Sequence, residues 1–410
     1  MSKGEFITTV EEAEEAYSKE LGTVYTPKQI GEAYQMPEAR MPGNGEAQID
    51  SIKMFINGLG DKNPLFRDEE YARNTKYKDV IAPGVYLNTC WVPSGTIVNP
   101  RVNNTLRSFN SGAAWEWFRP IWRGDKFTFK AISPSKVELK TSKTAGKTLH
   151  IHSRFEYTNH HGELVGIGSG YSIKAPREEI KKRATYTDVP ELKITPKDLK
   201  DIQDAQDREI IRGATPRYWE DVELNEELCP VVMGPTSHVE ATSWYAIFPT
   251  YATRSDKLVR NVAYFEGLGC KESLTGAPTT CINEMIERSM TNTQGWIPGA
   301  FTSGGQQAAA LVFGGQRLCW QSILLTNWMG DDGFLWKMNS RYEKFHALGD
   351  TAWYKGKVTN KYIDEGKYCV DIDCFAENQR KEITQRGKAT VILPSRKQGE
   401  VIYPVPRIEA

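Results

Sequence analysis

The residues best suited to chemistry stand close together in the first quarter of the chain. The order Asp-Lys-Asn-Pro at residues 61–64 is typical of a tight turn, and Asp68 is placed to cap a short helix over residues 69–72. Pro83-Gly84 then opens an apolar segment, which predicts a buried helix that begins at the glycine. A carboxylate beside the start of such a helix offers a base for water and backbone N–H donors for a developing oxyanion.

This order resembles the signature of the MaoC-like acyl dehydratases, hotdog-fold proteins that add water to enoyl-thioesters or remove it from hydroxyacyl-thioesters. The resemblance extends over both halves of the chain, from about Gly22 to Arg396. It implies that Asp61 is the catalytic base, that Asn63 orients water or the carboxylate, and that the Gly84 N–H donates to the thioester oxygen. The residues expected to contact the substrate are Phe66, Pro83, Val85 and Arg317.

One position departs from the family pattern. Active members place histidine five residues after the aspartate, where this chain has Phe66, which carries no proton. Three alternatives remain: Asp61 acts alone and passes on a proton taken from water, another residue supplies the acid, or the protein binds acyl thioesters without converting them. The candidates for the acid are His238, His152 and Tyr245, and His238 is taken as the catalytic one because it stands where a helix is expected to begin. The corresponding stretch of the second half, residues 243–249, lacks the Asp-x-Asn-Pro-x-His order.

The elements that would position these residues occur twice. Alternating strand patterns surround Gly124-Asp125 and an Asn159 turn in the first half, and Gly349-Asp350 and Asn378 in the second. The two sets lie about 220 residues apart, which predicts a duplicated module. Each set follows a glycine-led apolar segment, at residues 83–87 and 314–328. A curved antiparallel sheet wrapped round such a helix buries it on all sides, so the predicted fold is α+β with two hotdog modules.

The predicted organisation is an N-terminal helical extension (1–20), a first hotdog module (21–175), a charged linker (176–216) and a second hotdog module (217–410). Within the linker, Thr195 as N-cap, Pro196 and Gly213 are expected to bracket a helix. Leu199, Ile202 and Ile210 would lie along one side of it. Residues 248–307 show no periodicity and are expected to carry insertions over the ligand site.

Several polar residues outside the motif have two interpretations. Arg317, beside the second glycine-led helix, could grip a phosphate or carboxylate, or it could pair with Asp331 or Asp332. His150 and His152 share one face of a strand, where cross-strand packing is favoured over metal binding because no third ligand is near. No metal site is predicted.

Composition excludes some classes of partner. Lys and Arg total 52 and Asp and Glu also total 52, so no net charge attracts nucleic acid or an acidic membrane. No stretch approaches the roughly 20 apolar residues that cross a bilayer. The seven cysteines include no C-x-x-C pair, which favours free thiols and a cytoplasmic location.

The function predicted from these features is hydration of an enoyl-CoA or dehydration of a 3-hydroxyacyl-CoA, with no cofactor except the coenzyme A of the substrate. The protein is expected to act as a homodimer or in a complex with another hotdog chain. The alternatives are a hotdog acyl-CoA thioesterase and a non-catalytic acyl-CoA-binding partner subunit. A catalytically silent second module is further expected to leave a tunnel for a bulky acyl group, unless its many aromatic rings fill that space.

Overall fold

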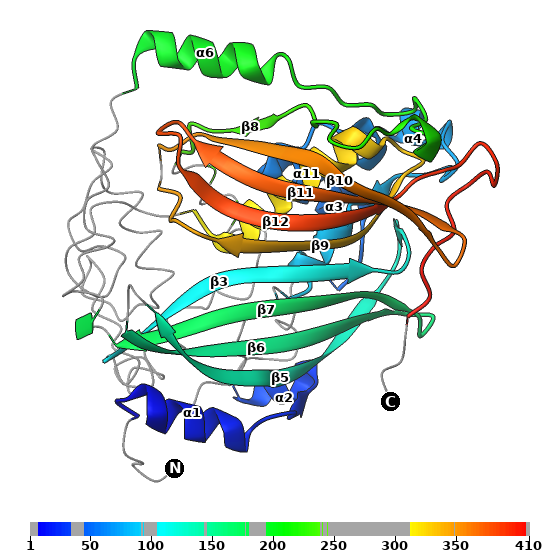
Figure 1. Cartoon of the computed structure of the whole chain (residues 1–410). Helices are drawn as coiled ribbons and strands as arrows, with labels where there is room; N and C mark the ends of the chain where they lie inside the picture. Colours follow the sequence, from blue (N-terminus) through cyan, green and yellow to red (C-terminus); the bar gives the residue numbers. More distant parts are fainter. Residues whose placement is uncertain are drawn as a thin grey trace.

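The computed structural model describes residues 7–33, 45–91, 93, 105–142, 146–176, 178–179, 194–237, 240, 244, 312–347 and 349–406. Its main feature is a single antiparallel sheet of ten strands, in the order β1-β5-β6-β7-β3-β9-β12-β11-β10-β8. Figure 1 shows two curved halves that meet where β3 runs beside β9. The first half contains β1 (Val24–Tyr25), β3 (Leu106–Trp117), β5 (Phe127–Ser142), β6 (Gly146–Asn159) and β7 (Leu164–Pro176). The second contains β8 (Val231–Met233), β9 (Phe334–Tyr342), β10 (Ala352–Asp364), β11 (Lys367–Asn378) and β12 (Ile383–Ile392).

The strand order repeats between the halves. From the shared centre outward, the first half runs β3, β7, β6, β5 and the second runs β9, β12, β11, β10. The four long strands of each half are thus matched in order and in connection. This confirms the prediction of an α+β fold with two hotdog modules. A separate two-stranded sheet pairs β2 (Ile81–Ala82) with β4 (Ile121–Trp122).

The turns that join equivalent strands use the same side-chain contacts. The Asn159 Oδ1 accepts from the N–H groups of His161 and Glu163, and its amide donates to the Glu163 carboxylate at 2.9 Å. Asn378 repeats all three bonds with Arg380 and Glu382, again with 2.9 Å between its amide and the carboxylate. A short asparagine side chain satisfies the backbone of a tight hairpin, which explains why the same residue type marks both turns.

The second module has the long central helix that its sequence predicts. Helix α11 (Gly314–Met329) lies behind the sheet, and its residues from Gly315 to Trp328 are all buried. A helix buried on every side must satisfy its polar side chains internally. The Gln321 amide does so by donating to the carbonyl of Asn339 on β9.

The first module begins its equivalent segment at the predicted glycine, but the described part is a short 3₁₀ helix, η3 (Gly84–Thr89). Helix α3 (Ile49–Leu59) packs against it. The α3 residues Ile52, Phe55, Ile56 and Leu59 are buried because they recur at helical spacing along one face.

The remaining helices lie at the periphery and include α1 (Val10–Lys19), α2 (Pro27–Ala33), α6 (Pro196–Gln206) and η4 (Trp219–Asp221). Helix α6 begins as predicted, with Thr195 as its N-cap and Pro196 in its first turn. The prediction that it extends to Gly213 is wrong. It ends at Gln206, and the following segment runs along the sheet edge, where the Glu209 carboxylate accepts from the Val232 N–H at 2.7 Å. The three apolar residues predicted to share one side do not do so: Ile202 is buried, whereas Leu199 and Ile210 are exposed.

Some sequence predictions fall outside the described residues, among them the insertions over residues 248–307. Five of the seven cysteines lie within the described residues, and all five are free thiols. In the part of the chain that the structure describes, no helix is both long and apolar enough to cross a membrane.

Candidate active site

The Asp61 turn is fixed by the end of α3. Gly60 adopts the left-handed conformation (φ 74°) that terminates the helix, and the Asp61 N–H donates to the Ile56 carbonyl at 3.0 Å. The Asp61 carboxylate accepts from the Asn63 N–H at 2.9 Å, and an Arg67 N–H group donates to the Asp61 backbone carbonyl at 3.3 Å. The turn predicted from the sequence is therefore present, and it points the carboxylate inward.

Burial changes the acidity of this carboxylate. The side chain of Asp61 is 2% exposed, and burial raises its pKa to about 6, although the Asn63 N–H and the Arg67 charge oppose this shift. A carboxyl group with a pKa near 6 can both accept and donate a proton close to neutral pH.

Asn63 has one structural contact and one free group. Its side-chain oxygen accepts from the Leu65 N–H at 3.1 Å and caps the 3₁₀ helix η2 (Pro64–Phe66). Its amide nitrogen donates to no other described residue, although Asn63 is 3% exposed and lines an internal cavity. The next helix, α4 (Glu69–Arg73), is capped by Asp68 as predicted. The turn and cap interpretation of the motif is thus correct, and the same turn also lines the cavity.

Gly84 lines the same cavity, at the start of η3. A Cβ atom at this position would lie 2.8 Å from two atoms of the Trp117 indole, so the close approach of backbone to ring requires glycine. The N–H groups in the first turn of a helix have no partner within the helix and are available to a ligand.

The internal cavity has a volume of about 60 Å³, which is room for a few water molecules. Its walls come from both modules. The residues of the first module that line it include Asn63, Phe66, Pro83, Gly84, Trp117 and Arg119. The second-module lining includes Ser322 and Thr326 of α11 and Asp331 of the loop that follows it.

Asp331 was not predicted to be a cavity residue. It is 4% exposed, its Oδ2 accepts from the Tyr71 hydroxyl at 2.6 Å, and its Oδ1 is buried without a hydrogen-bond partner. Burial raises the pKa of this carboxyl, Asp332 adds to the rise, and the Tyr71 hydrogen bond opposes it. The sequence feature that could have indicated Asp331 is its position directly after the second central helix.

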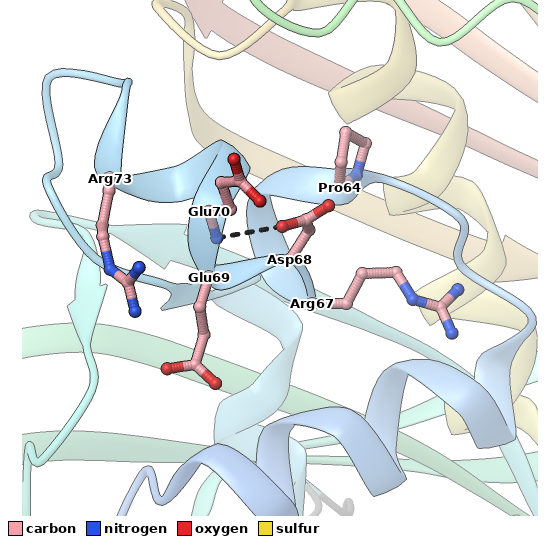
Figure 2. A pocket seen from close by; sticks show the side chains of 6 residues that line it. All are labelled: Pro64, Arg67, Asp68, Glu69, Glu70 and Arg73. Carbon is pink, nitrogen blue, oxygen red and sulfur yellow. Dashed lines mark hydrogen bonds between the residues drawn. The ribbon is translucent and has the colours of Figure 1, made fainter.

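A second hollow adjoins the motif on its outer side. It has a volume of about 590 Å³, is open to solvent and is lined by Pro64, Arg67, Asp68, Glu69, Glu70 and Arg73. Figure 2 shows Arg67 and Arg73 on opposite sides, with the three acidic residues between them. Because both signs of charge are present and the walls are polar, this surface lacks the apolar enclosure of a typical small-molecule site.

The structure brings only some of the predicted site residues together. Asn63, Phe66, Pro83 and Gly84 line one cavity, whereas the Asp61 carboxylate lies behind Asn63 and is not a lining group. Val85 is buried but does not line this cavity. His238 and Tyr245 lie outside the described residues, and His152 packs on Tyr171, with 4.6 Å between the ring centroids. Among the described residues, no cluster of three or more His, Cys, Asp or Glu side chains is arranged to hold a metal ion.

The structure gives Arg317 other partners than Asp331 or Asp332, and its contact with the substrate stays a prediction. Its guanidinium is buried and donates to the backbone carbonyls of Lys344 and Thr384 at 3.0 and 2.6 Å, and it stacks on Tyr342. It therefore neither lines the cavity nor pairs with Asp331 or Asp332. The physical reason is that carbonyl groups at the end of the second sheet half accept from both terminal nitrogens of the buried cation, and the sequence does not show such backbone partners.

Comparisons with known proteins agree with this arrangement. Residues 42–167 match the family model described as FAS1-like, dehydratase domain region. A UPF0336 protein of Parafrankia sp. (strain EAN1pec) is 27% identical over 125 residues, which cover 29% of this chain and 78% of that protein.

Two solved structures share the fold over nearly the whole chain. A MaoC-like dehydratase superimposes with a TM-score of 0.58 and 14% identity, over 93% of this chain and 100% of that one. A putative MaoC domain protein dehydratase from Chloroflexus aurantiacus J-10-fl gives 0.50 and 13%, over 92% and 96% of the two chains. The resemblance predicted from the motif is confirmed at the level of fold and region: residues 42–167 match a FAS1-like dehydratase region, and the chain shares the double hotdog fold of MaoC-like dehydratases along its length.

Proposed function

We propose that the protein is an acyl-thioester hydratase or dehydratase that acts on a coenzyme A ester. The observation that carries this proposal is the buried Asp61 carboxylate, whose pKa is raised to about 6 and which accepts from the N–H of Asn63, a residue that lines a cavity together with Gly84. These three residues lie within the part of the chain that matches a dehydratase region.

In the proposed hydration, Asp61 accepts a proton from water, and the hydroxide adds to the β carbon of the enoyl group. The carboxylate reaches the cavity through one bridging water, a route that general bases use in other enzymes. The free Asn63 amide hydrogen-bonds the attacking water. The Gly84 N–H donates to the thioester oxygen, on which negative charge develops in the transition state.

The apolar walls of the cavity have a separate role. Phe66 and Trp117 are both buried beside Gly84. They exclude bulk water, and this strengthens each hydrogen bond made to the reacting atoms. Phe66 therefore contributes to substrate contact but leaves the proton at the α carbon to another group.

The proposal includes no metal or redox cofactor. We also propose that the protein works in the cytoplasm, which the five described free thiols support. A homodimer or a complex with another hotdog chain is the proposed assembly, and the mass of the purified protein in solution tests it.

The test is a screen of enoyl-CoA esters of varied bulk, in which products are identified by mass and free thiol is measured in parallel. We expect one ester to gain the mass of one water without thiol release. The Asp61→Asn variant should lower kcat/KM by about 10²- to 10⁴-fold, because it removes the general base. Glu70→Gln is the matched control, since Glu70 is an exposed acid of the same motif.

Two results would contradict the proposal. Release of free coenzyme A from a saturated acyl ester would indicate a thioesterase. Binding of acyl-CoA without turnover, unchanged in the Asp61→Asn variant, would indicate a non-catalytic binding subunit.

A further inference from the structure

We propose that Asp331, contributed by the second module, is the catalytic group that exchanges the proton at the α carbon of the bound thioester. This inference rests on the proposed hydratase or dehydratase function. It assigns the proton transfer that Phe66 cannot perform to a residue on the other half of the molecule.

The position of Asp331 is fixed by the first module. The Tyr71 hydroxyl donates to its Oδ2 at 2.6 Å, and the Tyr77 hydroxyl donates to its backbone carbonyl at 3.2 Å. The Asp331 N–H in turn donates to the Gly213 carbonyl at 2.9 Å. Because three contacts hold the loop, the carboxylate keeps one orientation beside the cavity.

One oxygen of this carboxylate lacks a hydrogen-bond partner among the described residues. Oδ1 is buried and accepts no hydrogen bond from them, although Asp331 lines the cavity that also contains Asn63 and Gly84. An unpartnered polar atom in a buried position calls for an explanation. A substrate bound in this cavity would give Oδ1 a partner, either the α C–H group or the proton that Asp331 delivers to it.

The charges around Asp331 permit both protonation states. Burial and Asp332 raise the pKa of Asp331, whereas the Tyr71 hydrogen bond and the Lys76 charge lower it. Asp61, with a pKa raised to about 6, occupies a separate environment. Two carboxyl groups in different environments are the usual arrangement for an acid and base pair. The other charged groups close to Asp331 are Arg119, which lines the same cavity, and Arg212, which contacts Gly330.

The proposed steps balance. In dehydration, the α C–H bond breaks and its proton passes to Asp331 Oδ1, while the electron pair forms an enolate whose oxygen accepts from the Gly84 N–H. The enolate then forms the Cα–Cβ double bond, the Cβ–O bond breaks, and Asp61 protonates the departing hydroxide, which leaves as water. Asp331 loses its proton to solvent and Asp61 regains one, so no oxidant or reductant is required. Hydration follows the same steps in reverse.

The experiment compares three variants in the full-length protein, using the enoyl-CoA ester that the wild type converts best. Asp331→Asn keeps an acceptor for Tyr71 and should lower kcat by about 10²- to 10⁴-fold with KM nearly unchanged. Glu70→Gln is the control and should retain wild-type kcat, because Glu70 is exposed and is not a residue of this cavity. Asp61→Asn should lower kcat/KM by about 10²- to 10⁴-fold, as the proposed function requires, and this variant separates the two proposals.

A second readout needs no variant. The pair must hold one proton in total, so kcat/KM of the wild type should fall on both sides of a maximum, with one of the two declines near pH 6, the pKa of Asp61. If Asp61 worked alone as the base, kcat/KM would instead rise through about pH 6 and stay level.

Retention of kcat within about threefold in Asp331→Asn, with kcat/KM lowered as expected in Asp61→Asn, would overturn this inference and leave the proposed function intact. A level alkaline profile in the wild type would overturn it as well, even if the Asp331 variant failed to fold. Absence of turnover in the wild type with every ester would overturn both proposals.

Discussion

The two modules begin their central helices in the same way, yet the cavity lined by Asn63 lies beside the start of the first one. A Cβ on Gly84 would lie 2.8 Å from the ring of Trp117, the last residue of β3, and a Cβ on Gly314 would lie 2.6 Å from the ring of Tyr342, the last residue of β9. Each glycine therefore lets a helix start against an aromatic ring at the end of the equivalent strand.

The surroundings of the two glycines differ in what they leave open. Beside Gly84 lies the cavity with the free amide of Asn63. Beside Gly314, the Tyr342 hydroxyl donates to the Gly314 carbonyl, and the Arg317 guanidinium covers the same ring and bonds to two strand carbonyls. The duplicated scaffold is thus retained in both modules, while the second position is occupied by its own side chains.

This comparison also bears on the predicted acyl tunnel. In the described part of the second module, α11 is buried along its length, and Trp320 donates to the Leu59 carbonyl while contacting Tyr354 and His346. These rings occupy part of the space, but a cavity lined by Ser322, Thr326 and Met329 lies along the same helix, so the tunnel stays a prediction.

The largest difference in folding stability is expected between variants of two buried carboxylates, one from each module. The folded-state pKa of Asp61 is raised above its unfolded value, so ionisation costs the folded state stability as pH rises from about 4 to about 6. Asp61→Asn should therefore be more stable than wild type at pH 7, by roughly 3 kcal/mol. Asp350 is the opposite case: burial acts to raise its pKa, but bonds from Arg380 at 2.6 and 2.8 Å outweigh it and lower the pKa.

Asp350→Asn should accordingly lose about 3–5 kcal/mol at pH 7, because it breaks a buried ion pair. This loss should shrink as pH falls below about 4, because the unfolded carboxylate takes up a proton there while the folded one, with its lowered pKa, does so only at lower pH. Urea unfolding of wild type and both variants, from strongly acidic pH to pH 8, measures the two slopes. Equal destabilisation of the two variants would show that Asp61 is a structural residue like Asp350.

A smaller contrast is expected from the two glycines. Gly84→Ala and Gly314→Ala should each cost about 1–3 kcal/mol of folding stability, because the added Cβ overlaps a packed ring. Only Gly84→Ala should also lower kcat/KM, by about tenfold or more, since it displaces Trp117 from the cavity wall. Melting temperatures and kinetics on both variants test this, and an equal loss of activity in the two would remove the functional distinction between the modules.

The smallest effects should be equal in the two modules. Asn159→Ala and Asn378→Ala each remove the same three hydrogen bonds from a hairpin turn, so each should cost about 1–2 kcal/mol. The two costs, from denaturant unfolding, should agree within about 0.5 kcal/mol. Clearly unequal losses of folding stability would mean that the two modules share their strand order but not the energetics of their turns.

The sequence predicts those features that depend on nearby residues. The Asn159 and Asn378 turns, the Asp68 cap and the glycine that begins each central segment follow from local backbone requirements, and the structure confirms them. The sequence does not reveal contacts between segments that are far apart along the chain. Asp331 joins Tyr71 across 260 positions, and the acceptors of Arg317 are backbone carbonyls, which every residue carries.

The most direct test of the proposed hydration follows the oxygen of water into the product. Wild-type protein is incubated with an enoyl-CoA ester in water enriched in heavy oxygen, and the position of the label is determined by mass fragmentation. Hydration with Asp61 as the base predicts label in the β-hydroxyl group of an intact 3-hydroxyacyl-CoA, and none with Asp61→Asn. Label in the carboxylate of a released acid, or equal labelling by the variant, would contradict it.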